Sequence, residues 1–152
     1  MKDKIAKDIM TNDVIVANKD DKISDIANLL IKEKIGGLPV VDENNKVVGV
    51  ISETDIMKKE THIESPRAIN ILQGIIFLDD MKKLEDNMKQ IAAYKVEDLM
   101  SKDIIKVNEN DTFDYIANIM IKKSINRVPV VDDEGKLKGI ICRYDIIKAM
   151  YN

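Results

Sequence analysis

An internal repeat constrains the fold of this chain more than any other feature of its sequence. When the chain is aligned with itself at an offset of ninety residues, Pro39 falls on Pro129 and Gly49 on Gly139 without a gap. Nearly half of the positions in the range 8–58 are identical to their partners, and many others exchange one apolar residue for another. Because a unit of about fifty residues buries too little surface to be stable alone, two copies that pack against each other are expected.

Each copy carries the pattern of a β-α-β-β-α unit. In the first copy, the β-branched run 14–16 predicts a strand, and apolar residues at helical spacing predict a helix over 23–31. The run 38–41 is too apolar to have a solvent-facing side, and turn residues connect it to a second strand over 47–51. A helix over 52–59 completes the unit. The predicted fold class is therefore α/β (α+β), with two pseudo-symmetric repeats packed sheet to sheet.

These patterns divide the chain into a first repeat over 1–59, a helical insertion over 60–94 and a second repeat over 95–152. The insertion has no counterpart in either copy. A Ser-Pro pair at 65–66 is typical of a helix start, and apolar residues recur on one side of an otherwise charged segment over 84–91. We interpret the insertion as a packed connector, with contact to a partner chain or closure over a ligand as the alternative.

The composition excludes several classes of function. The 24 basic and 27 acidic side chains give a net charge of −3 without a basic block, so no nucleic-acid partner is predicted. The most apolar segment, 69–78, is much shorter than the roughly 20 residues of a membrane span, so no membrane association is predicted. A single cysteine, Cys142, and the absence of a targeting segment predict a cytoplasmic protein. The only histidine, His62, has no ligand-spaced neighbour, and the sequence predicts no catalytic residues, no metal site and no enzyme.

Three motifs occur in the same order in both copies. They are Asp-Ile-Met-Thr at 8–11 with Asp-Leu-Met-Ser at 98–101, Leu-Pro-Val-Val-Asp at 38–42 with Val-Pro-Val-Val-Asp at 128–132, and GVISETD at 49–55 with GIICRYD at 139–145. Tandem units with these motifs resemble paired cystathionine beta-synthase (CBS) domains, also called Bateman modules. The resemblance covers nearly everything outside the insertion.

The resemblance implies a stand-alone regulatory module. Such modules bind adenosine-containing ligands, namely AMP, ADP, ATP or S-adenosylmethionine, in clefts between the two copies, and they control another protein, in some cases by sensing the energy state. The ligand is then a regulatory ligand, and no cofactor is expected. The regulated partner is not identified by the sequence.

The resemblance also assigns roles to individual residues. Asp55 and Asp145 are expected to bind the ribose, because a carboxylate accepts hydrogen bonds from both hydroxyls of a diol. Ser52, Arg127 and Arg143 are expected at the phosphate or at the helix N-terminus that faces it. The adenine is expected to lie in an apolar slot formed by Val14, Ile15, Val16, Leu38, Pro39, Ile104, Ile105, Val128 and Pro129.

The two copies differ at two of these positions. Copy one has Ser52 but carries Gly37 where copy two has Arg127, and copy two has Cys142 where copy one has Ser52. This predicts two clefts with different polar side chains. The cleft of copy two, with Arg127 and Asp145, is the one suited to phosphate. Alternatives remain: Ser52 and Asp55 also form the pattern of a capping box, and Arg127 is also consistent with a surface cation. The alternative function is a non-binding scaffold with degenerate clefts.

A homodimer is also expected. Paired modules of this kind commonly associate two by two through an isologous interface. The predicted contact is formed by the second helix of each copy, over 52–59 and 142–150. The apolar residues expected in it are Ile56, Met57, Ile146, Ile147 and Met150.

Overall fold

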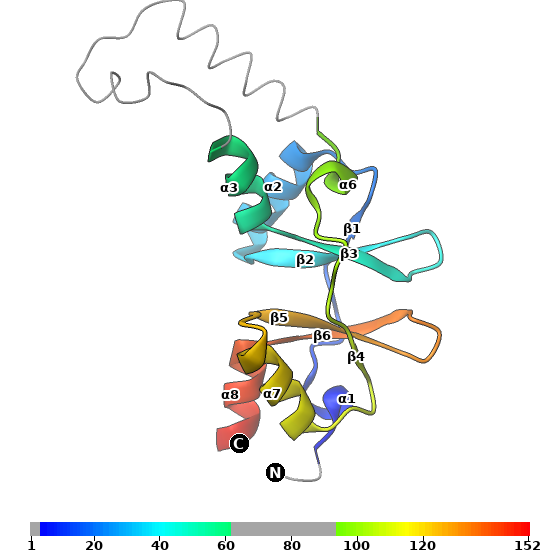
Figure 1. Cartoon of the computed structure of the whole chain (residues 1–152), viewed down its shortest axis with the longest axis vertical. Helices are drawn as coiled ribbons and strands as arrows, with labels where there is room; N and C mark the ends of the chain where they lie inside the picture. The colour runs from blue at the N-terminus through cyan, green and yellow to red at the C-terminus, as the bar shows by residue number, and fades with distance from the viewer. Residues whose placement is uncertain (1–3, 62–93) are drawn as a thin grey trace, which may run out of the picture.

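The computed structural model describes residues 4–61 and 94–152. In this part of the chain two three-stranded sheets lie against each other, and helices cover the outer side of each sheet (Figure 1). The predicted fold class and the sheet-to-sheet packing are therefore confirmed. The helices predicted for the insertion lie outside the described residues.

The two copies contain the same elements in the same order. The first copy contributes α1 (Ala6–Ile9), β1 (Ala17–Asn18), α2 (Ile23–Glu33), β2 (Gly37–Val41), β3 (Val47–Ser52) and α3 (Glu53–Thr61). The second copy contributes α6 (Val96–Leu99), β4 (Val107–Asn108), α7 (Phe113–Lys122), β5 (Arg127–Val131), β6 (Leu137–Cys142) and α8 (Arg143–Tyr151). The β-α-β-β-α order is as predicted, but each copy begins with a short helical turn that the sequence did not indicate.

The central hairpin of each sheet follows the turn chemistry of the sequence. β2 pairs antiparallel with β3, and β5 pairs antiparallel with β6 in the same register. In the first turn, the Asp42 carboxylate accepts hydrogen bonds of 2.9 Å from the backbone N–H groups of Asn44 and Lys46. Asn45 and Gly135 occupy matching turn positions with positive φ of 61° and 81°, a conformation that both residue types tolerate.

The strand predicted over 14–16 is displaced toward the C-terminus. β1 and β4 pair in parallel with β2 and β5 only through two residues each, at 17–18 and 107–108. The reason is that Thr11 pairs with Ile140 of the other sheet, so the residues between Thr11 and β1 carry the chain from one sheet to the other. The apolar run 14–16 therefore belongs to a crossing segment and not to a strand.

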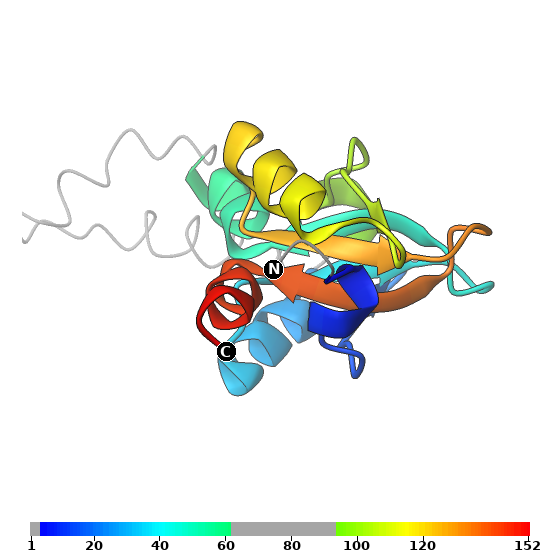
Figure 2. The same ribbon diagram turned by 90° about the horizontal axis from the view of Figure 1, so that it is seen from below.

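The opening segment of each copy packs on the opposite copy. α6 lies with the first sheet and α1 with the second, as Figure 1 shows, and Figure 2 shows α1 beside the second sheet. Ala6 and Val96 are both 0% exposed, the first in the core under α7 and α8 and the second in the core under α2 and α3. The two copies are therefore joined by exchanged segments as well as by their sheets.

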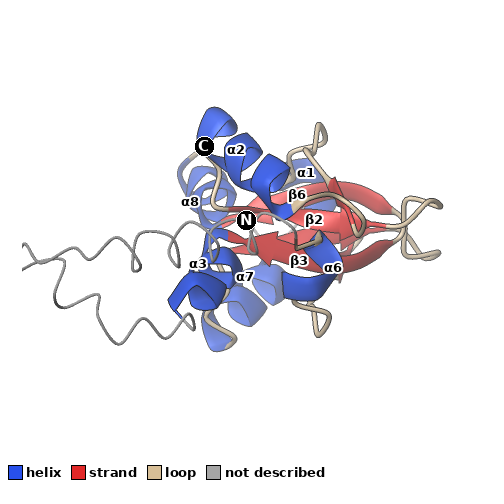
Figure 3. Ribbon diagram, turned by 90° about the horizontal axis from the view of Figure 1, so that it is seen from above, coloured by secondary structure: helices blue, strands red, loops and turns tan. Residues whose placement is uncertain are grey.

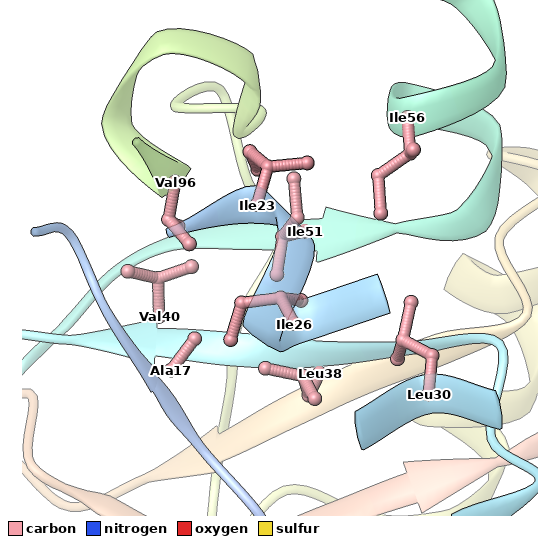
Figure 4. Close-up of a cluster of buried hydrophobic side chains, with 9 residues drawn as sticks. All are labelled: Ala17, Ile23, Ile26, Leu30, Leu38, Val40, Ile51, Ile56 and Val96. Carbon is pink, nitrogen blue, oxygen red and sulfur yellow. The ribbon is translucent and has the colours of Figure 1, made fainter. Parts of the chain in front are cut away.

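The first core lies between the sheet and α2, as shown in Figure 4. Ile23, Ile26 and Leu30 recur at i, i+3 and i+7, so their side chains share one face of α2, and all three are buried. They meet Leu38 of β2 and Ile51 of β3. The second core repeats this arrangement between α7 and its sheet.

The hairpin turns of the two sheets lie side by side at one end of the molecule, shown in Figure 3. Val47 N–H donates to the Gly135 carbonyl at 3.3 Å, and Leu137 N–H donates to the Asn45 carbonyl at 3.0 Å. The sheets are thus joined by backbone hydrogen bonds at this end. The candidate site lies away from these turns, where β3 and β5 approach the start of α3.

Candidate functional site

The opening segment of the second copy reaches the last strand of the first. Ser101 and Val50 exchange two backbone hydrogen bonds of 2.9 and 3.1 Å. The preceding Met100 lies over Gly49, where an added Cβ would be 2.7 Å from the Met100 sulfur. The N-terminal segment makes the same close approach over Gly139. The repeated glycine of the GVISETD and GIICRYD motifs is therefore explained by the approach of the other copy.

Asp55 forms the capping box that the sequence left open as an alternative. Its Oδ2 accepts hydrogen bonds of 2.9 Å from both the backbone N–H and the hydroxyl of Ser52, while the Asp55 N–H donates to the Ser52 hydroxyl at 3.3 Å. The second carboxylate oxygen, Oδ1, accepts from the Ser101 hydroxyl at 3.4 Å, beyond the usual length of an O–H···O bond. One carboxylate oxygen therefore caps α3, and the other makes only a long contact.

Asp145 caps α8 in the same way without a hydroxyl. Its Oδ2 accepts a hydrogen bond of 2.7 Å from the backbone N–H of Cys142. The Ser-to-Cys exchange does not remove this hydrogen-bond donor, because the donor belongs to the backbone. Burial raises the pKa of the half-buried Cys142 thiol, the negative charge of Asp145 adds to this, and the positive charge of Arg127 opposes it. The thiol therefore stays protonated at neutral pH and is a poor nucleophile.

Arg127 crosses from the second copy to the first. Its backbone pairs with Cys142 at the start of β5, but its Nη1 donates a 3.2 Å hydrogen bond to the carbonyl oxygen of Gly36 in the first copy. Gly37 lies directly beneath the same guanidinium. The prediction that the cation belongs with Asp145 is therefore wrong: a long side chain on one sheet reaches the opposite sheet, which sequence position does not reveal.

A cleft of about 330 Å³ opens where these groups meet, and we name it the Asp55 cleft. Ser52 and Asp55 line it from the first copy. Arg127 and the apolar side chains of Ile104, Ile105 and Pro129 line it from the second copy. The cleft therefore combines a hydroxyl, a carboxylate, a guanidinium and an apolar wall, all of them predicted site residues.

Two predicted slot residues lie elsewhere. Leu38 and Val128 are 1% and 0% exposed and belong to the two cores that face the helices. Successive side chains of a strand point to opposite faces, so Pro129 lies at the cleft while its neighbour Val128 is directed into the core. The prediction that Leu38 and Val128 line the adenine slot is wrong for this reason.

The remaining slot residues of the first copy do not line the Asp55 cleft. Val16 packs against the valines near the hairpin turns, and Ile15 is 37% exposed. Val14 and Pro39 are the first-copy counterparts of Ile104 and Pro129, which line the Asp55 cleft. By the symmetry of the repeat, Val14 and Pro39 therefore belong to the equivalent side of the molecule, near Asp145.

Asp145 and Arg143 are separated from the Asp55 cleft. Asp145 lines a polar pocket of about 300 Å³ together with Lys4, Thr11 and Lys148. Arg143 lines an apolar groove between α7 and α8. Arg143 is the first residue of α8 and so lies at a helix N-terminus, but it lines this outer groove and not the Asp55 cleft.

The distribution of the predicted polar groups differs from the one expected, because Arg127 joins Ser52 and Asp55. The hydroxyl of Ser52, the carboxylate of Asp55 and the guanidinium of Arg127 all lie in one cleft. On the related side, Cys142 replaces the hydroxyl, and the position that corresponds to Arg127 is Gly37. The two clefts do differ, but Ser52, Asp55 and Arg127 lie together in one cleft, while Asp145 lies in the other with Lys4, Thr11 and Lys148.

Several residues of the cleft were missed by the sequence analysis. Lys58 lies three residues after Asp55, at a spacing that places both on one face of α3, and this pattern could have revealed it. Glu53 begins the same helix. Ser101 and Asp103 enter only because the opening segment of the second copy crosses over, so no local pattern indicates them.

Within residues 4–61 and 94–152, no group of three or more His, Cys, Asp or Glu side chains is arranged to hold a metal ion. None of the helices in these two ranges has the length and apolar character needed to cross a membrane.

Comparison with known proteins identifies the family. The sequence model of the CBS domain matches residues 6–61 and 96–152, which together make up most of the chain. The chain belongs to the CBS domain family. The CBS pair is 37% identical to the uncharacterized protein MJ1426 of Methanocaldococcus jannaschii, over 96% of this chain and 90% of that protein.

Two solved CBS pairs with bound ligands have the same fold. The structure of CBSX2 from Arabidopsis thaliana in complex with AMP has a TM-score of 0.73 and 26% identity, and the match covers 96% of this chain and 95% of that one. The CBS pair of protein MJ0100, in complex with 5′-methylthioadenosine and S-adenosylmethionine, has a TM-score of 0.72 and 28% identity over 97% of this chain and 95% of that one.

Other relatives are much longer than this CBS pair. The chain spans 46% of protein MJ1225 and 23% of an inosine-5′-monophosphate dehydrogenase, both from Methanocaldococcus jannaschii. Since the match covers less than a quarter of that enzyme, it gives no argument for a catalytic activity in the CBS pair.

Proposed function

We propose that this CBS pair is a regulatory module that binds an adenosine-containing ligand in the Asp55 cleft. The observation that carries the proposal is the convergence of Asp55, Ser52 and Arg127 with an apolar wall between the two copies. The ligands of the related CBS pairs, AMP in one and 5′-methylthioadenosine with S-adenosylmethionine in the other, support it. Control of a partner protein by the bound ligand is part of the proposal.

Each group has a role that follows from its chemistry. The Oδ1 atom of Asp55 accepts from the ribose hydroxyls, since Oδ2 is already engaged in the cap of α3. Ile104 and Ile105 provide most of the apolar surface for adenine, and the buried Pro129 lies at the same wall. Arg127 binds the anionic group of the ligand, because a guanidinium offers several donors to a phosphate or carboxylate.

The charge of the cleft favours a ligand with one anionic group. Glu53, Asp55 and Asp103 contribute three carboxylates, against the two cations Lys58 and Arg127. A polyphosphate would bring further negative charge next to these carboxylates, and like charges at close range repel each other. We therefore expect AMP or S-adenosylmethionine to bind more tightly than ATP.

The first test is the exchange of Asp55 for alanine. We expect Asp55→Ala to weaken AMP binding by about tenfold or more, because a half-buried acceptor for the ribose is lost. Isothermal titration calorimetry with AMP, ATP and S-adenosylmethionine measures this.

Asp145→Ala is the matched control, since it removes the corresponding helix cap in the other copy and leaves the Asp55 cleft intact. Equal losses in the two variants would assign the effect to capping instead of ligand contact. If none of the three ligands produces heat or a thermal shift with the unmodified chain, the proposal fails and the scaffold function takes its place.

The outer helices support a homodimer. Five large apolar side chains are 46–76% exposed on α2, α3, α7 and α8, namely Ile31, Met57, Ile121, Ile147 and Met150. The exposed isoleucines of α2 and α7 occupy equivalent positions in the two copies, as do Met57 and Ile147. We propose that a second copy of the chain covers these faces, an arrangement that suits an isologous contact.

The proposed dimer contact leaves out two of the five residues that the sequence predicted. Ile56 is only 9% exposed and belongs to the first core, and Ile146 packs against the second core. The proposed contact therefore uses Met57, Ile147 and Met150 of the second helices together with residues of α2 and α7.

A further inference from the structure

The guanidinium of Arg127 occupies the space that side chains at positions 36 and 37 would need. A Cβ added at Gly36 would lie 2.7 Å from Nη2 of Arg127, and a Cβ added at Gly37 would meet Nη1. Neither glycine has a positive φ, so the backbone conformation does not require glycine at either position. At Gly36 an added side chain would disturb the close approach of Arg127, and at Gly37 an added Cβ would also lie 2.8 Å from the Ile51 carbonyl oxygen.

The second copy shows that the fold accepts side chains at the corresponding positions. These are Asn126 and Arg127, in equivalent strand registers: Gly37 pairs with Ser52 as Arg127 pairs with Cys142. The backbone at the next helix start is also equivalent. Glu53 N–H donates to the Gly36 carbonyl at 3.0 Å, and its counterpart in the second copy makes a bond of 3.1 Å.

The Gly36 carbonyl fixes the guanidinium once the space is open. It accepts the 3.2 Å hydrogen bond from Nη1 while it also accepts from the start of α3. Arg127 thereby lines the same cleft as Ser52 and Asp55, although its own strand pairs with Cys142. A guanidinium has five N–H donors, so this bond leaves donors for an anion.

We propose that Gly36 and Gly37 are positioning residues that admit Arg127 of the second copy to the Asp55 cleft and so decide that the anionic group of the ligand binds there. The inference rests on the proposed function for the identity of the ligand, but the placement of Arg127 is independent of it. The absence of a side chain at these positions is thus a specificity determinant and not a lost binding residue.

The test is a double-mutant cycle between Gly36→Ala and Arg127→Ala. Gly36 is the cleaner site, because a Cβ there meets only the ends of the Arg127 and Glu53 side chains, whereas one at Gly37 also approaches the Ile51 carbonyl at 2.8 Å. Each single change is expected to weaken AMP binding by about tenfold, the typical effect of losing one charge-assisted contact. The double variant is expected to bind no more weakly than either single variant.

Adenosine serves as the probe without an anionic group, and its affinity is expected to be the same in all four proteins. Lys122→Ala, a charge removal on the outer helix α7, is expected to leave AMP binding unchanged. Losses of AMP affinity that add in the double variant, or equal losses for AMP and adenosine, would overturn the proposal.

Thermal unfolding gives a readout that needs no ligand. Gly36→Ala is expected to lower the unfolding midpoint in the unmodified chain and to leave it unchanged or raised when Arg127 is already alanine. A midpoint lowered equally in both backgrounds would refute the placement of Arg127. If AMP, ATP, S-adenosylmethionine and adenosine all fail to bind the unmodified chain, the proposed function fails. The unfolding measurements on the four proteins still decide whether the glycines position Arg127.

Discussion

At the scale of single residues, the surroundings of Cys142 in the fold raise the pKa of its thiol. Its N–H donates to the carboxylate of Asp145, and burial together with that carboxylate raises the pKa of its thiol. The folded chain therefore holds the thiol proton more tightly than the unfolded chain. This contribution to stability is complete below the pKa of an unfolded cysteine, about 8.5, and is lost as pH rises through the higher pKa of the folded state.

We therefore expect the stability difference between the unmodified chain and Cys142→Ala to shrink above about pH 8.5 and to be constant at neutral pH. Urea unfolding of both proteins between about pH 7 and 10 measures it, and the titration of other groups cancels in the difference. A difference that stays constant over this range would contradict the raised pKa.

At the scale of elements, the exchanged opening segments couple the two copies. α6 opens the second repeat in the sequence but contributes Val96, which is fully buried, to the core of the first sheet. α1 contributes Ala6 to the core of the second sheet in the same way. Each copy is therefore incomplete without a segment that belongs to the other.

Val96→Ala is expected to destabilise the chain by about 1–3 kcal/mol through loss of buried methyl groups. Hydrogen exchange should show the faster exchange first in β2 and β3, far from Val96 in the sequence. Deletion of residues 1–10 should have the reciprocal effect on β5 and β6. If Val96→Ala accelerated hydrogen exchange only in the second copy, or the deletion only in the first, the packing of each opening segment on the opposite copy would be contradicted.

At the scale of the whole molecule, the exposed apolar faces of α2 and α7 bear on assembly. Ile31 and Ile121 are each 76% exposed, although their helical spacing alone would place them on the buried faces. They lie at the last turns of their helices, in grooves that also contain residues of α3 and α8. A second copy would bury these side chains.

The double change Ile31→Glu and Ile121→Glu is expected to shift the chain from dimer to monomer, because it places charges in an apolar contact. Sedimentation at micromolar concentration measures the mass. Lys32→Glu with Lys122→Glu adds the same side chains one position further along each helix and should leave the dimer largely intact. A monomeric mass for the unmodified chain would contradict the proposed dimer.

Local patterns predicted the elements whose stability depends on near neighbours. The hairpins of β2–β3 and β5–β6 follow from turn residues between apolar runs, and α2 follows from the spacing of its buried face. The capping box of Ser52 and Asp55 was also readable, because its partners are three residues apart. The prediction of a strand over 14–16 was wrong because an apolar segment that crosses between sheets has the same composition as a strand.

The sequence by itself determined that two equivalent β-α-β-β-α units pair in this chain, since the repeat and its apolar periodicities depend only on residues close together in the sequence. Only the tertiary structure decided which side chains share a cleft. Arg127 meets Asp55 and not Asp145 because a long side chain reaches the opposite sheet over Gly36 and Gly37. Such a contact depends on how the two sheets are stacked, and stacking is a property of the whole fold that no local spacing of residues encodes.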